Sequence, residues 1–105
     1  MADLTQDEWI EQLNDDGNAV ILDVRTEDEM EAGFIPGALN IDIYKGQEFL
    51  DELEKLDKSK NYYVYCRSGA RSAQACALMN QSNFENAYNL KGGFMEWEGE
   101  VVFPE

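Results

Sequence analysis

The stretch from residue 61 to residue 81, NYYVYCRSGARSAQACALMNQ, decides the fold of this chain. Its first six residues form an apolar, tyrosine-rich run, which predicts a buried strand that ends at Cys66. Gly69 and Ser72 then open an alanine-rich run to about Gln81, which predicts a helix. A strand joined to a helix by a short loop is the repeating unit of α/β proteins, so the sequence predicts an α/β fold.

The same alternation of strands and helices extends over the rest of the chain. Residues 19–24, AVILDV, are apolar without alternation, as expected for a strand covered on both faces of a parallel sheet. Thr5 and Glu8 have the spacing of a capping box at the start of a helix. The other predicted elements are strands at 38–41 and 87–90, and helices at about 5–17, 27–32, 47–56 and 94–97. This order indicates one domain over residues 1–105, in which parallel strands dominate.

Composition and charge exclude several classes of function. The 22 acidic and 8 basic residues give a net charge of −14, which opposes binding to nucleic acid and to anionic membranes. The chain has no histidine and only 2 cysteines, so we expect no metal, no cofactor and no disulfide framework. No apolar run is long enough to span a bilayer, and the first residues lack the features of a signal peptide. We therefore expect a cytoplasmic protein.

Cys66 is the candidate reactive group. It ends a buried strand, and ligand sites in α/β sheets lie beyond the carboxyl ends of strands. The next helix directs its unpaired N–H groups at the loop, Gly69 lets these groups converge on one anion, and Arg67 and Arg71 add positive charge. Residues 58–84 contain no acidic side chain that would repel an anion. We therefore expect a reactive thiol whose pKa lies below that of free cysteine.

Three segments of the chain resemble the rhodanese family of sulfurtransferases. They are ILDVRTEDEMEAGFIPGALNIDI at 21–43, YVYCRSGARSAQACALM at 63–79 and NAYNLKGGFMEW at 86–97. They follow the family's order and spacing and span most of the chain. The resemblance implies a mainly parallel, five-stranded sheet flanked by helices on both faces. It also implies a cysteine that accepts a sulfane sulfur as a persulfide and passes it to a thiophilic acceptor.

The resemblance also implies individual site residues. Cys66 matches the nucleophile that forms the persulfide, and Asp23 and Arg25 match residues that brace the family's site. Phe34 is a departure, because the family often has histidine at that position. The implied substrate-binding loop consists of Arg67, Ser68, Gly69, Ala70 and Arg71.

The implied reaction moves sulfur from thiosulfate or a persulfide donor to cyanide or a thiol, and two alternatives remain. One is a non-enzymatic rhodanese-like binding or sulfur-relay module, for which the acidic surface would suit a basic protein partner. The other is a cysteine phosphatase or arsenate reductase. Such phosphatase loops need five residues between cysteine and arginine, whereas Cys66 and Arg71 are separated by four. The loop is therefore sized for something smaller than a phosphoryl group.

The second cysteine, Cys76, has two interpretations. Redox cysteines often work in pairs, so Cys76 could be a resolving thiol for Cys66. It lies about two turns into the predicted helix, near Ala73 and Ala77, where a small apolar residue facing the sheet is expected. Core packing is therefore the favoured interpretation.

Overall fold

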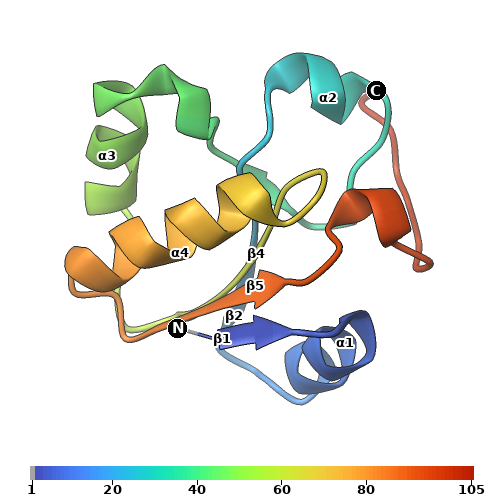
Figure 1. Cartoon of the computed structure of the whole chain (residues 1–105), viewed down its shortest axis with the longest axis horizontal. Coiled ribbons are helices and arrows are strands. Elements are labelled where there is room, and N and C mark those ends of the chain that lie inside the picture. The colour runs from blue at the N-terminus through green and yellow to red at the C-terminus, as the bar shows by residue number, and fades with distance from the viewer. Residues whose placement is uncertain (1) are drawn as a thin grey trace.

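The computed structural model describes residues 2–105 and is built on a five-stranded sheet in the order β1-β5-β4-β2-β3 (Figure 1). All four pairs of neighbouring strands are parallel. The expected α/β class and five-stranded parallel sheet are confirmed. The strands are β1 (Ala2–Leu4), β2 (Ala19–Asp23), β3 (Leu39–Asn40), β4 (Asn61–Tyr65) and β5 (Asn86–Leu90).

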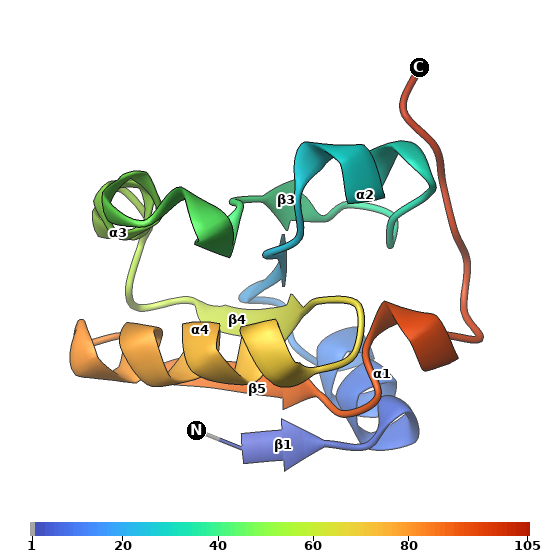
Figure 2. The same ribbon diagram turned by 45° about the horizontal axis from the view of Figure 1, so that its top comes forward.

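Helices cover both faces of this sheet (Figure 2). The capping box that opens the first of them is confirmed, because Thr5 accepts from the N–H of Glu8 and donates its own N–H to the Glu8 carboxylate. Thr26 and Glu29 form a second box at the second helix. No helix within residues 2–105 is both long and apolar enough to cross a membrane. The helices are α1 (Gln6–Asn14), α2 (Glu27–Glu31), α3 (Gln47–Glu54) and α4 (Ala70–Gln81), with 3-10 turns η1 (Ile43–Lys45) and η2 (Phe94–Glu96).

Two short elements differ from the sequence-based expectation. β1 was not expected, because three residues carry no periodic pattern; it forms by pairing with β5, for example Leu4 with Leu90. The strand expected at 38–41 contains only two residues, although the Ile41 N–H still donates to the carbonyl of Asp23. Both elements lie at the edges of the sheet, where pairing with one neighbour decides whether a strand forms.

The central strand β4 directs its side chains into two separate cores. Tyr63 and Tyr65 pack with Trp9 of α1 on one face, whereas Val64 and Cys66 pack on the other face with α3 and α4. Both faces of β4 are therefore buried, as its continuous apolar sequence predicted. Cys66 consequently emerges at the carboxyl end of β4 on the side that α4 covers.

Candidate active site

The thiol of Cys66 lies inside the loop that joins β4 to α4. Its Sγ accepts a hydrogen bond from the N–H of Gly69 at 3.1 Å and another from the hydroxyl of Ser72 at 3.3 Å. Cys66 itself has no exposed surface, and Ser72 is also fully buried. Donors from the first turn of α4 and from the loop before it therefore surround the sulfur.

These donors shift the ionisation of Cys66. Burial alone would raise the pKa of the thiol, since it penalises the charged thiolate. The Ser72 hydroxyl and the backbone N–H groups of Ser72, Gly69 and Ser68 outweigh burial, so the pKa of Cys66 lies below its ordinary value. The site therefore favours a thiolate, which is the nucleophilic form of cysteine.

Two glycines allow the loop to close this tightly. Gly69 has a φ of +101°, a left-handed conformation that places its N–H beside the sulfur. Gly93, in the turn after β5, has a φ of +59°, and a Cβ there would lie 2.7 Å from the carbonyl oxygen of Cys66. The N–H groups of Phe94 and Met95 donate to the carbonyls of Cys66 and Arg67 at 2.8 and 2.9 Å. The turn after β5 therefore fixes the back of the cysteine loop.

Arg71 is held by a residue of α2. Its Nη1 and Nη2 donate to the two carboxylate oxygens of Glu29 at 2.7 and 2.8 Å. These hydrogen bonds lower the pKa of Glu29 to about 2. The Arg71 guanidinium also lies 5.1 Å from the centre of the Tyr44 ring. Arg71 thus stands at the site with its fork already paired to a carboxylate, which reduces the net positive charge it offers to an anion.

The other loop residues offer mainly backbone groups and one cation. Ser68 supplies a backbone N–H to the thiolate, and its side chain is exposed. Ala70 is exposed at the start of α4. Arg67 is exposed as well and forms no salt bridge within residues 2–105. Arg67 is therefore the loop cation that is available to an approaching anion.

Asp23 and Arg25 form a buried ion pair behind the site. The Arg25 Nη2 lies 2.7 Å from the Asp23 carboxylate and also donates to the carbonyl of Gly33 at 2.8 Å. The Arg25 guanidinium stacks on the ring of Phe94 at 4.4 Å, and the Phe94 N–H in turn donates to the Cys66 carbonyl. The pair therefore reaches the cysteine loop through Phe94 and makes no hydrogen bond to the sulfur among the described residues.

Phe34, at the position where the family often has histidine, takes part in a contact with the C-terminal segment. Phe34 forms an isolated antiparallel bridge with Val102, in which each residue donates its N–H to the other's carbonyl at 2.9 Å. This bridge attaches the C-terminal segment beside α2. Phe34 has no hydrogen bond to Cys66 in the described part of the chain.

Cys76 lies in the core cluster between α4 and the sheet and has no exposed surface. Burial raises the pKa of its thiol to about 12, so it is neutral at ordinary pH. Both cysteines are free thiols. Within residues 2–105, no three Cys, Asp or Glu side chains are grouped to hold a metal ion.

Three residues that shape the site were not predicted from the sequence. Ser72 touches the sulfur, and its place in the first turn of the helix after a strand-end cysteine was the available signal. Glu29 holds Arg71, and its spacing from Thr26 marks a capping box but not this long-range contact. Asn89 on β5 donates its side-chain amide to the Gly69 carbonyl at 3.2 Å and to Asp3 at 2.9 Å. No local pattern indicates that last contact.

The fold is thus a parallel α/β sheet, and its site holds a strand-end cysteine whose sulfur accepts hydrogen bonds from Gly69 and Ser72 and whose thiolate form is favoured. The rhodanese-like domain model matches residues 6–100, and the chain belongs to the rhodanese-like family. The resemblance expected from the three sequence segments is therefore confirmed.

Several known proteins are similar over nearly their whole length. A protein of Allochromatium vinosum named sulfurtransferase is 34% identical over 98 residues, which cover 90% of this chain and 89% of that protein. The crystal structure of a rhodanese-like domain protein from Staphylococcus aureus is 30% identical, with a TM-score of 0.85 and 100% of both chains covered. The human single-domain sulfurtransferase TSTD1 is 27% identical, with a TM-score of 0.73, over 92% of this chain and 96% of that one.

A different kind of relative contains a similar domain as a minor part. The tRNA uridine(34) hydroxylase of Erwinia tasmaniensis is 36% identical over 92 residues, which are 84% of this chain but only 26% of that enzyme. The similarity to proteins named sulfurtransferase covers nearly the whole of both partners. The relatives therefore support a rhodanese-type sulfurtransferase.

Proposed function

We propose that this protein carries a sulfane sulfur as a persulfide on Cys66 and transfers it to a thiophilic acceptor. The observation that carries the proposal is the pair of hydrogen bonds from Gly69 and Ser72 to the Cys66 sulfur. They stabilise the thiolate, and the same set of donors suits the terminal sulfur anion of a persulfide.

With thiosulfate as donor, the Cys66 thiolate attacks the outer, sulfane sulfur. The sulfur–sulfur bond of thiosulfate breaks, and its electron pair leaves with sulfite. Cys66 then holds a persulfide anion, so the total charge is unchanged. Sulfite is a stable anion, so the step needs no general acid, and the absence of histidine from the chain is no obstacle.

In the second step, a nucleophilic acceptor attacks the outer sulfur of the persulfide. Cyanide becomes thiocyanate, or a thiolate becomes a new persulfide, and the electron pair of the broken bond returns to Cys66 as its thiolate. Persulfide donors can load Cys66 by the reverse of the thiol reaction. The exposed Arg67 stands at the loop to attract an anionic donor.

The site argues against the phosphatase alternative. Besides the short spacing from Cys66, the Arg71 fork is occupied by Glu29 at 2.7 and 2.8 Å. A phosphoryl group that relied on bidentate binding would find this fork already paired, whereas the proposed attack on the sulfane sulfur of thiosulfate needs no bidentate contact.

Mass spectrometry of the intact protein tests the proposal. The reduced protein is incubated with thiosulfate, and we expect a gain of one sulfur atom that cyanide removes as thiocyanate. Cys66→Ser should abolish the gain, whereas Cys76→Ala should retain it because that thiol is buried and neutral. If the sulfur adds equally to Cys66→Ser, the assignment of the nucleophile is wrong. If the protein gains no sulfur from thiosulfate or from a small persulfide, it is a non-enzymatic rhodanese-like binding module and the proposal is wrong.

A further inference from the structure

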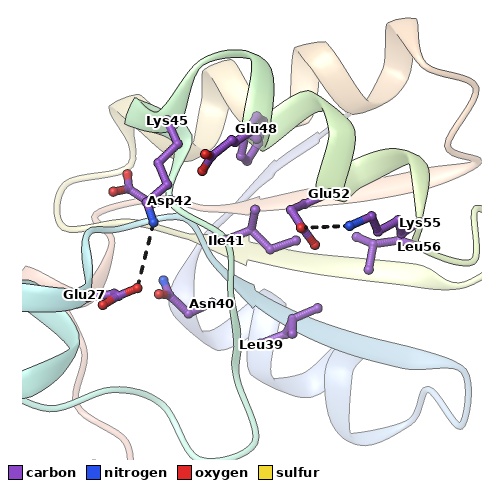
Figure 3. Close-up of a pocket in the computed structure, with 11 residues that line it drawn as sticks. Glu27, Leu39, Asn40, Ile41, Asp42, Lys45, Glu48, Glu52, Lys55 and Leu56 are labelled. Atoms are coloured by element: carbon purple, nitrogen blue, oxygen red, sulfur yellow. Dashed lines mark hydrogen bonds and ion pairs between the residues drawn. The ribbon is translucent and has the colours of Figure 1, made fainter.

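A groove of about 270 Å³ lies between β3 and α3, with Glu27 of α2 also in its lining (Figure 3). Its apolar lining consists of Leu39, which is exposed, Leu56, which is half-buried, and Ile41 and Phe49, which are buried. Leu39 is 40% exposed on the edge strand β3. An apolar side chain from outside the protein would bury this surface.

One wall of this β3–α3 groove is an open sheet edge. β3 is the last strand of the sheet and pairs only with β2. The Ile41 N–H points toward β2, where it donates to the carbonyl of Asp23, so the N–H of the preceding Asn40 points away from the sheet. The backbone of Asn40 could therefore hydrogen-bond to an extended segment that lies in the groove.

The rim of the groove is acidic. Glu27 and Glu52 lie near lysines, with Lys45 at 3.9 Å from Glu27 and Lys55 at 3.1 Å from Glu52. The other two rim carboxylates, Asp42 and Glu48, form no salt bridge within residues 2–105. This excess of negative charge favours a basic occupant. It disfavours a second copy of this chain, because each copy carries a net charge of −14.

The groove is linked to Arg71 of the cysteine loop through α2 and Tyr44. Glu27 belongs to α2, the helix whose Glu29 holds Arg71. Tyr44, which is 70% exposed, follows the groove residue Asp42 and places its ring 5.1 Å from the Arg71 guanidinium. A segment bound in the groove would therefore hold the rest of its protein near Arg71 and the loop that carries Cys66.

We propose that the β3–α3 groove docks a basic, extended segment of the protein that receives sulfur from Cys66. One apolar side chain of the segment packs on Leu39 and Leu56, and its flanking basic residues face Asp42 and Glu48. The acceptor's thiolate then attacks the outer sulfur of the Cys66 persulfide, and Cys66 leaves as its thiolate. This inference rests on the proposed function for the transfer step only, because docking itself needs no persulfide.

Two synthetic peptides serve as probes. The basic probe has the sequence Cys-Gly-Gly-Arg-Leu-Arg, and the acidic probe has glutamate in place of both arginines. Each is offered as the acceptor to protein whose Cys66 has been loaded with sulfur, and the peptide persulfide is measured. At low ionic strength we expect the basic probe to have a KM about tenfold lower, which corresponds to two exposed charge pairs.

Variants of the groove separate docking from general charge effects. Glu48→Lys should raise the KM of the basic probe about fivefold, and Leu39→Ser about threefold, because they remove a charge and an apolar contact. Transfer to cyanide, which is too small to use the groove, reports whether the persulfide chemistry is intact. The matched control is Glu11→Lys, an exposed position on α1 with the same change in charge. Since α1 covers the other face of the sheet, this variant should change the KM of the basic probe less than twofold.

A binding measurement keeps the test independent of sulfur transfer. A version of the basic probe with serine in place of cysteine is titrated into ¹⁵N-labelled protein, and we expect the largest amide shifts at 39–42 and 48–56. Equal KM values for the two probes, or shifts elsewhere that Glu48→Lys leaves unchanged, would overturn the docking proposal. Shifts at these residues on raising the protein concentration alone would assign the groove to a second copy instead. Failure of Cys66 to accept sulfur is detected before any peptide is added, and it counts against the proposed function alone.

Discussion

Glu29 and Arg71, which are 42 positions apart in the chain, are joined by two hydrogen bonds of 2.7 and 2.8 Å. The contact connects α2 to the first turn of α4 beside the reactive cysteine. Both side chains are largely shielded, with exposures of 27% for Glu29 and 17% for Arg71. The pair therefore sets where the Arg71 charge stands relative to the Cys66 loop, and it also braces the fold.

The Glu29–Arg71 pair should make the free energy of unfolding depend on pH in the acidic range. The pKa of Glu29 is about 2 in the folded protein against 4.5 for a free side chain, so its contribution is complete above pH 4.5. It is lost as the pH falls toward 2, because the folded state must then take up the proton. Glu29→Gln should lower the free energy of unfolding by roughly 1–2 kcal/mol at pH 7, allowing for partial exposure. Urea unfolding of both proteins between pH 7 and pH 2 measures the difference, and a difference that stays constant would contradict the assignment.

Arg71→Ala should lower kcat/KM for thiosulfate about tenfold. This loss is smaller than the loss expected on removing an unpaired cation from an active site, because Glu29 already offsets part of the Arg71 charge. Arg71→Lys should recover only part of the loss, because an ammonium cannot reproduce the planar fork. The double variant Glu29→Ala/Arg71→Ala should be more active than Arg71→Ala, because it removes a carboxylate that repels the donor. Full activity in Arg71→Ala would remove this arginine from the site.

Ser72→Ala should raise the pKa of Cys66, because the Ser72 hydroxyl donates to the sulfur and favours its charged form. A hydrogen bond to a charged group contributes about 1.5 kcal/mol, so alkylation of Cys66 by iodoacetamide at pH 7 should slow roughly tenfold. The pH profile of alkylation measures the change directly. Ser82→Ala, at the other end of α4, is the control and should leave the profile unchanged.

Gly93→Ala should destabilise the protein and the cysteine loop together. A Cβ at Gly93 would lie 2.5 Å from the Arg67 carbonyl oxygen, and the φ of +59° is itself unfavourable for alanine. We expect a loss of about 2 kcal/mol in the free energy of unfolding and slower persulfide formation in the folded fraction. Gly17→Ala is the matched control, since no atom lies within 4 Å of its added Cβ. Equal stability of the two variants would show that the turn after β5 does not fix the loop.

Salt should accelerate the loading of Cys66 by thiosulfate. A net charge of −14 repels this dianion at long range, while Arg67 and the loop N–H groups attract it at contact. Raising the ionic strength from 0.01 to 0.15 M shortens the Debye length from about 30 Å to about 8 Å, which screens the distant carboxylates more than the contacts. The second-order rate of persulfide formation, measured in a non-competing salt, should therefore rise. A steady fall over this range would show that the local basic groups govern the approach.

The sequence by itself determined the α/β class, the position of Cys66 at a strand end and the capping box at Thr5. Each of these depends on residues close together in the chain, such as the apolar run of β4 and the three-residue spacing between Thr5 and Glu8. In a strand-loop-helix segment with a glycine in the loop, the backbone N–H groups that surround the cysteine come from neighbouring residues. The lowered pKa of Cys66 could therefore be predicted from the sequence of this one segment.

Only the tertiary structure decided which distant groups complete the site and its surroundings. The sequence predicted Arg71 as an unpaired cation because its partner Glu29 lies on another helix. The strand β1 was not predicted because pairing with β5, and not its own sequence, makes it a strand. The β3–α3 groove likewise depends on how an edge strand and a helix meet. Contacts of this kind depend on the path of the whole chain through the sheet, and residue order within one segment does not encode that path.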